Sequence, residues 1–132
     1  MYRGRRYQGR RRPERRKSIA STDVSANDPL RVGVIVLTVG TALIHLYLGL
    51  QGFPLFVLNG LGYLTLLAAL ILPIPRISDY RNLTRWILLG YTALTIFLWI
   101  VVGAHTVIGY TDKIIEIVLI ALLVLEARRS RR

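Results

Sequence analysis

The chain has 132 residues, of which 53% are hydrophobic, and its formal net charge at pH 7 is +11. Its mean hydropathy of +0.46 averages over two unlike parts, because residues 1–29 are polar and basic while the rest is more apolar than a soluble domain. Cysteine is absent, which excludes disulfides, thiol catalysis and cysteine-ligated zinc or iron–sulfur centres.

Residues 1–29 are predicted to form a basic arm that is disordered in isolation, because a block so rich in Lys and Arg cannot bury a core. The basic residues expected to bind lipid headgroups or a partner lie in this arm and in a tail at 127–132: Arg10, Arg11, Arg12, Arg15, Arg16, Lys17, Arg128 and Arg129. The favoured partner of these basic residues is the anionic lipid headgroup, and the same residues are expected to orient the chain in the membrane. An acidic partner protein is the second alternative, and nucleic acid is the third.

Residues 30–126 are predicted to form four transmembrane helices, because their apolar runs approach the ~20 residues that cross a bilayer core. The expected spans are Leu30–Leu50, Pro54–Leu72, Leu83–Ala104 and Gly109–Glu126. Short connections within each pair predict two hairpins, so the fold class is an all-α, polytopic membrane protein. The fourth span has Asp112, Lys113 and Glu116 in its first turns, and a re-entrant or interfacial helix is the alternative there.

The distribution of charge predicts that both termini are cytoplasmic. With four spans, the termini and the loop at 73–82 lie on one side of the membrane, and that side holds every one of the 18 Lys and Arg residues except Lys113. The positive-inside rule assigns this side to the cytoplasm. The N-terminal region lacks the pattern of a cleaved signal peptide, so we expect the first span to be retained in the inner membrane.

Strongly polar residues within the spans are the candidate functional residues, because such side chains are costly at bilayer depth. They lie in the half of the bundle that we expect to face outward: His45, Asn59, His105, Asp112 and Glu116. One stripe of the first span has helical spacing, which predicts that its small and polar side chains face other helices: Thr38, Thr41, His45, Gly49 and Gly52. We therefore predict an outer polar cluster in which His45, Asn59 and Glu116 meet.

Four interpretations of this predicted cluster are open. The favoured one is structural, with His45 and Asn59 bonded to neighbouring helices and Glu116 paired with Lys113 or His45. The second is proton or solute handling by His45 and Glu116. The third is haem ligation by His45 and His105, and the fourth is a metal site that also uses Asp112 and Glu116. Under the favoured interpretation no cofactor, metal or catalytic residue is expected.

Three stretches, "HLYLG", "FVLNGLGYLTLLAALILP" and "GYTALTIFLWIVVG", resemble small four-helix membrane proteins of unassigned function, of Chloroflexota and haloarchaeal type. The resemblance covers residues 31–126, is most distinctive at His45–Gly49 and Asn59–Tyr63, and implies no activity. The small size and the basic arm predict a non-enzymatic accessory or scaffold subunit of a larger membrane complex. The alternative is a small proton-coupled carrier, acting as a homo-oligomer, or a ligand- or cofactor-binding membrane protein that uses the polar cluster.

Overall fold

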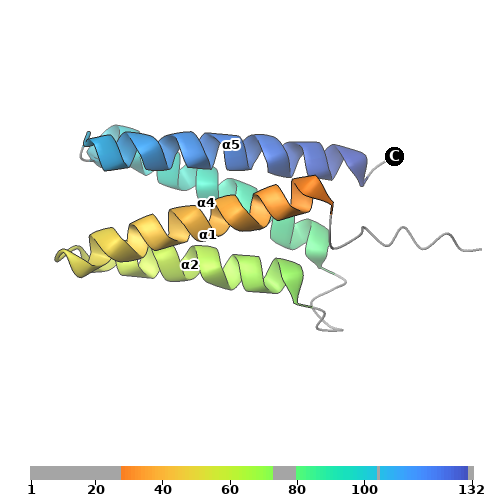
Figure 1. The fold of residues 1–132 in the computed structure, drawn as a ribbon, viewed down its shortest axis with the longest axis horizontal. Coiled ribbons are helices and arrows are strands. Elements are labelled where there is room, and N and C mark those ends of the chain that lie inside the picture. Colours follow the sequence, from red (N-terminus) through yellow and green to blue (C-terminus); the bar gives the residue numbers. More distant parts are fainter. Residues whose placement is uncertain (1–27, 73–79, 104, 131–132) are drawn as a thin grey trace, which may run out of the picture.

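The computed structural model describes residues 28–72, 80–103 and 105–130, and in these residues the chain forms four helices (Figure 1). They are α1 (Pro29–Leu50), α2 (Pro54–Ile71), α4 (Arg81–Val102) and α5 (Val107–Arg129). The prediction of an all-α chain with four helices is confirmed. The predicted basic arm lies outside the described residues except for Asp28 and Pro29, and the predicted tail is partly the last turn of α5.

The ends of α1 follow from the local sequence. Oδ1 of Asp28 accepts a hydrogen bond from the backbone N of Leu30 at 3.1 Å and so caps the helix. Pro29 occupies the first helical position, where its missing N–H breaks no helical bond. After the helix, Gly52 has a φ of 104°, which glycine adopts without strain, and it turns the chain into Pro54 at the start of α2.

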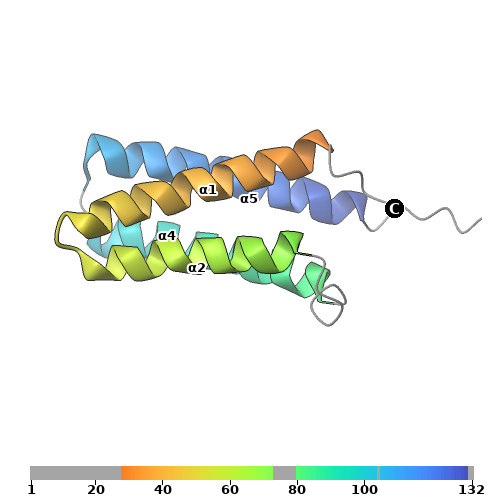
Figure 2. The same cartoon turned by 60° about the horizontal axis from the view of Figure 1, so that its bottom comes forward.

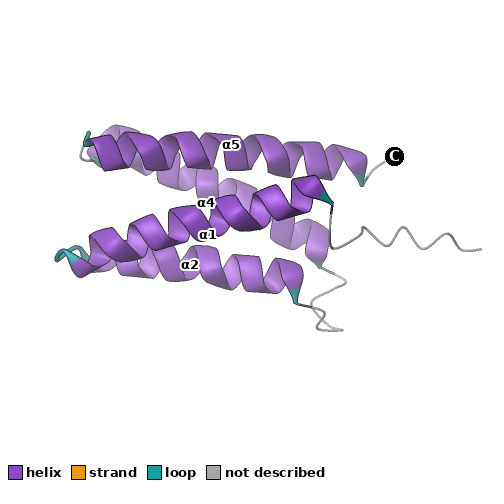
Figure 3. Ribbon diagram, in the orientation of Figure 1, coloured by secondary structure: helices purple, strands orange, loops and turns teal. Residues whose placement is uncertain are grey.

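The helices run alternately up and down, and helices consecutive in the chain lie side by side (Figures 1 and 2). α1 packs against α2 and α5, and α4 packs against the same two helices, so α1 and α4 occupy opposite corners of the bundle. The hairpin end contains the turn at 51–53, the end of α4 and the start of α5, and the terminal end contains the starts of α1 and α4 and the ends of α2 and α5. Figure 3 shows that the described residues are helical apart from short loop segments at the helix ends.

Three of the described helices, α1, α2 and α4, are long and apolar enough to cross a membrane. α5 has 23 residues, which span about 34 Å at the helical rise of ~1.5 Å per residue. It falls outside this group by composition rather than by length, because it carries charged residues near both of its ends.

The exterior of the bundle is apolar and its interior is partly polar. Large apolar side chains such as Leu55 and Val102, each 79% exposed, cover the outside, and an apolar exterior of this kind suits lipid rather than water. Most of the buried apolar residues form one core: Val34, Ala42, Tyr63, Leu70, Leu88, Leu119 and Leu123. Threonines and ionisable side chains fill much of the remaining interior.

Small residues allow α1 and α2 to approach closely. A Cβ atom added to Gly49 would lie 2.8 Å from the backbone N of Val57, and one added to Gly60 would lie 2.8 Å from the carbonyl O of Ala42. Such contacts between backbones are typical of helices that associate in lipid. The α1–α2 hairpin therefore depends on these two glycines.

Candidate functional site

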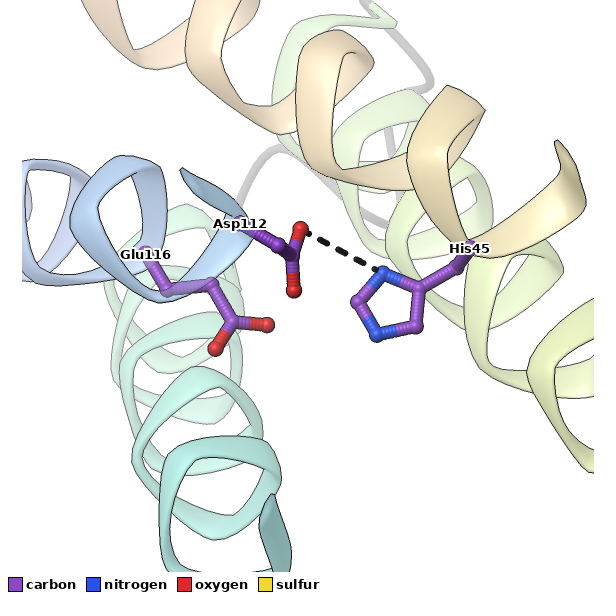
Figure 4. Close-up of side chains that lie close together, drawn as sticks. All are labelled: His45, Asp112 and Glu116. Carbon is purple, nitrogen blue, oxygen red and sulfur yellow. Dashed lines mark ion pairs between the residues drawn. The ribbon is translucent and has the colours of Figure 1, made fainter. Parts of the chain in front are cut away.

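Ionisable side chains of α1 and α5 meet inside the hairpin half of the bundle (Figure 4). His45, Asp112 and Glu116 each offer one ligand atom, and these atoms lie within 4.8 Å of one another. These three side chains and Lys113 are all buried, with exposed fractions between 0% and 6%. We refer to His45, Asp112, Lys113 and Glu116 as the charged cluster.

Lys113 joins the two carboxylates of the charged cluster. Its Nζ lies 3.1 Å from Oδ2 of Asp112 and donates a hydrogen bond to Oε2 of Glu116. Residues three apart on a helix share a face, which is why Lys113 and Glu116 can pair without any rearrangement of α5. The ammonium group therefore lies in contact with both acids.

The other oxygen of Glu116 is contacted by hydroxyl groups from the remaining helices. The hydroxyls of Tyr63 on α2 and Thr95 on α4 each lie 2.8 Å from Oε1 and can donate to it. Oγ1 of Thr41 on α1 is 3.5 Å from the same atom and donates to Oδ1 of Asp112 at 2.7 Å. Glu116 is thus the point at which side chains of all four helices converge.

His45 lies at the edge of the charged cluster. Its Nδ1 is 2.8 Å from the carbonyl O of Thr41 and 3.7 Å from Oδ1 of Asp112. A carbonyl oxygen can only accept, so Nδ1 carries the ring proton and Nε2 is the nitrogen that can take up another. The ring packs against Phe56 and Tyr63, with centroid separations of 5.7 and 5.8 Å.

The formal charges of the cluster do not balance when His45 is neutral. Asp112 and Glu116 contribute two negative charges and Lys113 contributes one positive charge, which leaves a net charge of −1. An uncompensated charge is unfavourable when it is buried away from water. Uptake of one proton makes the cluster neutral.

The ligand types of the cluster would suit a divalent metal, but the position of Lys113 argues for a proton instead. Its ammonium group already contacts both carboxylates. A metal ion bound by Asp112 and Glu116 would have to displace that group or lie beside a like charge. The arrangement is therefore better matched to proton exchange than to metal binding.

Two of the five predicted site residues lie away from the charged cluster. Asn59 is half-buried on α2, and its backbone O accepts a hydrogen bond from the hydroxyl of Tyr91 at 3.2 Å. His105 is exposed at the hairpin end, where its ring packs against Trp99 at a centroid distance of 4.8 Å. The two histidines thus occupy different environments, and the side chain that α2 contributes to Glu116 is Tyr63.

Comparisons with known proteins do not place the chain in a family. No protein-family model, no curated protein and no solved structure matches it. The resemblance to small four-helix membrane proteins stays a prediction.

Proposed function

We propose that this chain is a proton-binding integral membrane protein in which the charged cluster takes up and releases one proton. The observation that carries the proposal is the joint burial of four ionisable side chains whose formal charges sum to −1 while His45 is neutral. Ionisable groups buried inside membrane bundles commonly mark proton or ion pathways. The two exchange positions are Nε2 of His45 and the carboxylates.

The proposal includes α5 as a fourth transmembrane helix. α5 lies against both α1 and α4, and its members of the charged cluster face the interior of the bundle. Ile114, Ile117 and Val118 are exposed and would face lipid. Both termini then share the side rich in Lys and Arg, which the positive-inside rule assigns to the cytoplasm.

The activity that such a cluster would serve is proton-coupled transport, with the chain acting as a carrier. Protonation of Glu116 would weaken its attraction for Lys113 and alter its bonds to Tyr63 and Thr95. Because these partners lie on different helices, a change of charge at one carboxylate changes the contacts between helices. Coupling requires a ligand to interact differently with two arrangements of the protein. Four helices enclose little space, so the carrier would act as an oligomer.

Infrared difference spectroscopy of the full chain in detergent, between alkaline and acidic pH, tests proton uptake directly. We expect a carboxyl or imidazole protonation signal that is lost or altered in Glu116→Gln, Asp112→Asn and His45→Gln. Asp28→Asn is the matched control, because it also removes one carboxylate while asparagine remains a good helix cap. If all three cluster variants give the same signal as the unaltered chain, the charged cluster does not exchange a proton.

A second candidate is a non-enzymatic accessory or scaffold subunit of a larger membrane complex. It is supported by the short connections at the hairpin end, which leave little mass outside the helices, and by the basic residues gathered near the N-terminus. We expect a stoichiometric partner to co-purify from native membranes and to be lost when the Arg and Lys residues of the arm are changed to Gln. A monodisperse sample without other proteins would contradict the accessory function and leave the proton-binding proposal intact.

A further inference from the structure

The terminal end of the bundle contains a second site, separate from the charged cluster. A cavity of about 120 Å³ is lined by residues of all four helices: Arg31, Leu70, Arg81, Arg85 and Glu126. One water molecule requires only ~10–15 Å³ of such space, so this cavity has room for a larger polar group. We refer to these five residues as the arginine pocket. Three arginines and one glutamate give it a formal charge of +2.

One of the three arginines in the pocket is paired. Nε of Arg85 lies 3.4 Å from Oε2 of Glu126, and Nη1 of Arg85 donates to Oγ of Ser130 at 2.9 Å. The ion pair does not have the geometry of a hydrogen bond, and both facing atoms are buried without a hydrogen-bond partner in the described ranges of the chain. Glu126 therefore offsets the charge of Arg85 but not the charges of the other two arginines in the pocket.

The other two arginines have no compensating negative charge within the described residues. Arg31 and Arg81 have neither an ion pair nor a hydrogen-bond acceptor for their guanidinium groups within the described part of the chain, and Nε of Arg81 is buried. A buried N–H group without an acceptor is unfavourable, and native proteins rarely retain one. Among the described residues, the pocket therefore lacks a negatively charged acceptor for Arg31 and Arg81.

The start of α4 adds to this positive potential. Arg81 is the first residue of α4, and the preceding Tyr80 makes no side-chain capping bond. The first N–H groups of a helix have no partner within the helix and form the positive end of its dipole, which favours an anion. At the start of α1, in contrast, Asp28 already provides the negative cap.

We propose that the arginine pocket binds a phosphate group, carried by an anionic phospholipid or by a soluble phosphate compound. The guanidinium group is planar and donates paired N–H bonds that match the oxygens of phosphate. Arg31 and Arg81 supply these donors, while Glu126 remains with Arg85 and keeps the anion on the other side of the pocket. This inference is independent of proton binding at the charged cluster.

Titration calorimetry of the full chain in phosphate-free detergent solution, with inorganic phosphate as the probe, tests the pocket. We expect Arg31→Gln and Arg81→Gln each to weaken binding about tenfold or more, since each removes a charged donor. Glu126→Gln is expected to strengthen binding, because it removes the negative charge of the pocket. A general loss of structure would weaken binding in all three variants, so the opposite sign distinguishes the two causes.

Arg128→Gln is the matched control, because Arg128 is an exposed arginine near the same end and does not line the pocket. A second measurement identifies the source of the phosphate: reconstitution with phosphatidylcholine alone or with added phosphatidylglycerol, followed by native mass spectrometry. One phosphatidylglycerol per chain, lost in Arg81→Gln, indicates a lipid headgroup; binding of inorganic phosphate alone indicates a soluble compound. The proposal is overturned if neither probe binds, or if Arg128→Gln weakens binding as much as Arg81→Gln.

Discussion

Lys113 is the residue on which the charged cluster depends most directly. Its ammonium group contacts the carboxylates of both Asp112 and Glu116, and the residue is 6% exposed. Removing one partner of a buried ion pair leaves an uncompensated charge and typically costs about 3–5 kcal/mol. Replacing a whole buried pair by neutral residues costs much less, because no charge is then left unpaired.

We therefore predict that Lys113→Met lowers the free energy of unfolding by about 3 kcal/mol. Adding Glu116→Gln to this variant should recover part of the loss, because it removes the charge that lost its partner. Denaturant unfolding in detergent, followed by circular dichroism, measures both effects. Equal stabilities of the single and the double variant would show that Lys113 and Glu116 are not energetically coupled.

At the residue scale, the sequence predicted only part of the charged cluster. His45 and Glu116 meet, as expected from their similar distance to the same end of the bundle. Counting residues along a helix predicts how deep a residue lies in the bundle better than it predicts the direction in which the residue faces. On α2 it is Tyr63, one turn beyond Asn59, that contacts Glu116. Lys113 was expected as a possible partner of Glu116, but its contact with both acids depends on how α5 packs.

At the scale of a helix pair, Gly60 shows how closely α1 and α2 approach. We predict that Gly60→Ala destabilises the fold by about 1–3 kcal/mol, because the added methyl group would press on the carbonyl O of Ala42 and overpack the interface. Gly40→Ala is the matched control, since a Cβ at Gly40 meets nothing within 4 Å. The same unfolding measurement compares them, and similar effects of both variants would mean that helix propensity outweighs the close contact.

The helices themselves were predictable because their ends carry clear local signals, such as Pro29 after the capping Asp28 and the turn at Gly52. The arginine pocket was not predicted. In the sequence, Arg31, Arg81 and Arg85 indicate only the orientation of the chain, and no local spacing connects Arg31 to the other two. They come together because α1 and α4 begin at the same end of the bundle, which is a property of the tertiary arrangement.

At the scale of the whole molecule, the lack of cysteine allows the topology to be tested with single cysteines. We predict that Gln51→Cys and Val107→Cys react with a membrane-impermeant maleimide from one side of the membrane, and Ser130→Cys from the other. All three positions are exposed, with Val107 at 83%. Labelling of Val107→Cys and Ser130→Cys from the same side would show that α5 lies at the interface and does not cross.

The uneven composition of the four helices has a consequence for how the chain enters the membrane. α1, α2 and α4 are long and apolar enough to cross a membrane, whereas α5 brings buried acids whose hydroxyl partners are Thr41, Tyr63 and Thr95. These partners belong to the three helices synthesised before it. We therefore expect α5 to pack last, when the hydroxyl groups that bond its carboxylates are already in place on the other three helices. The order of translation would then also set the order in which the helices assemble.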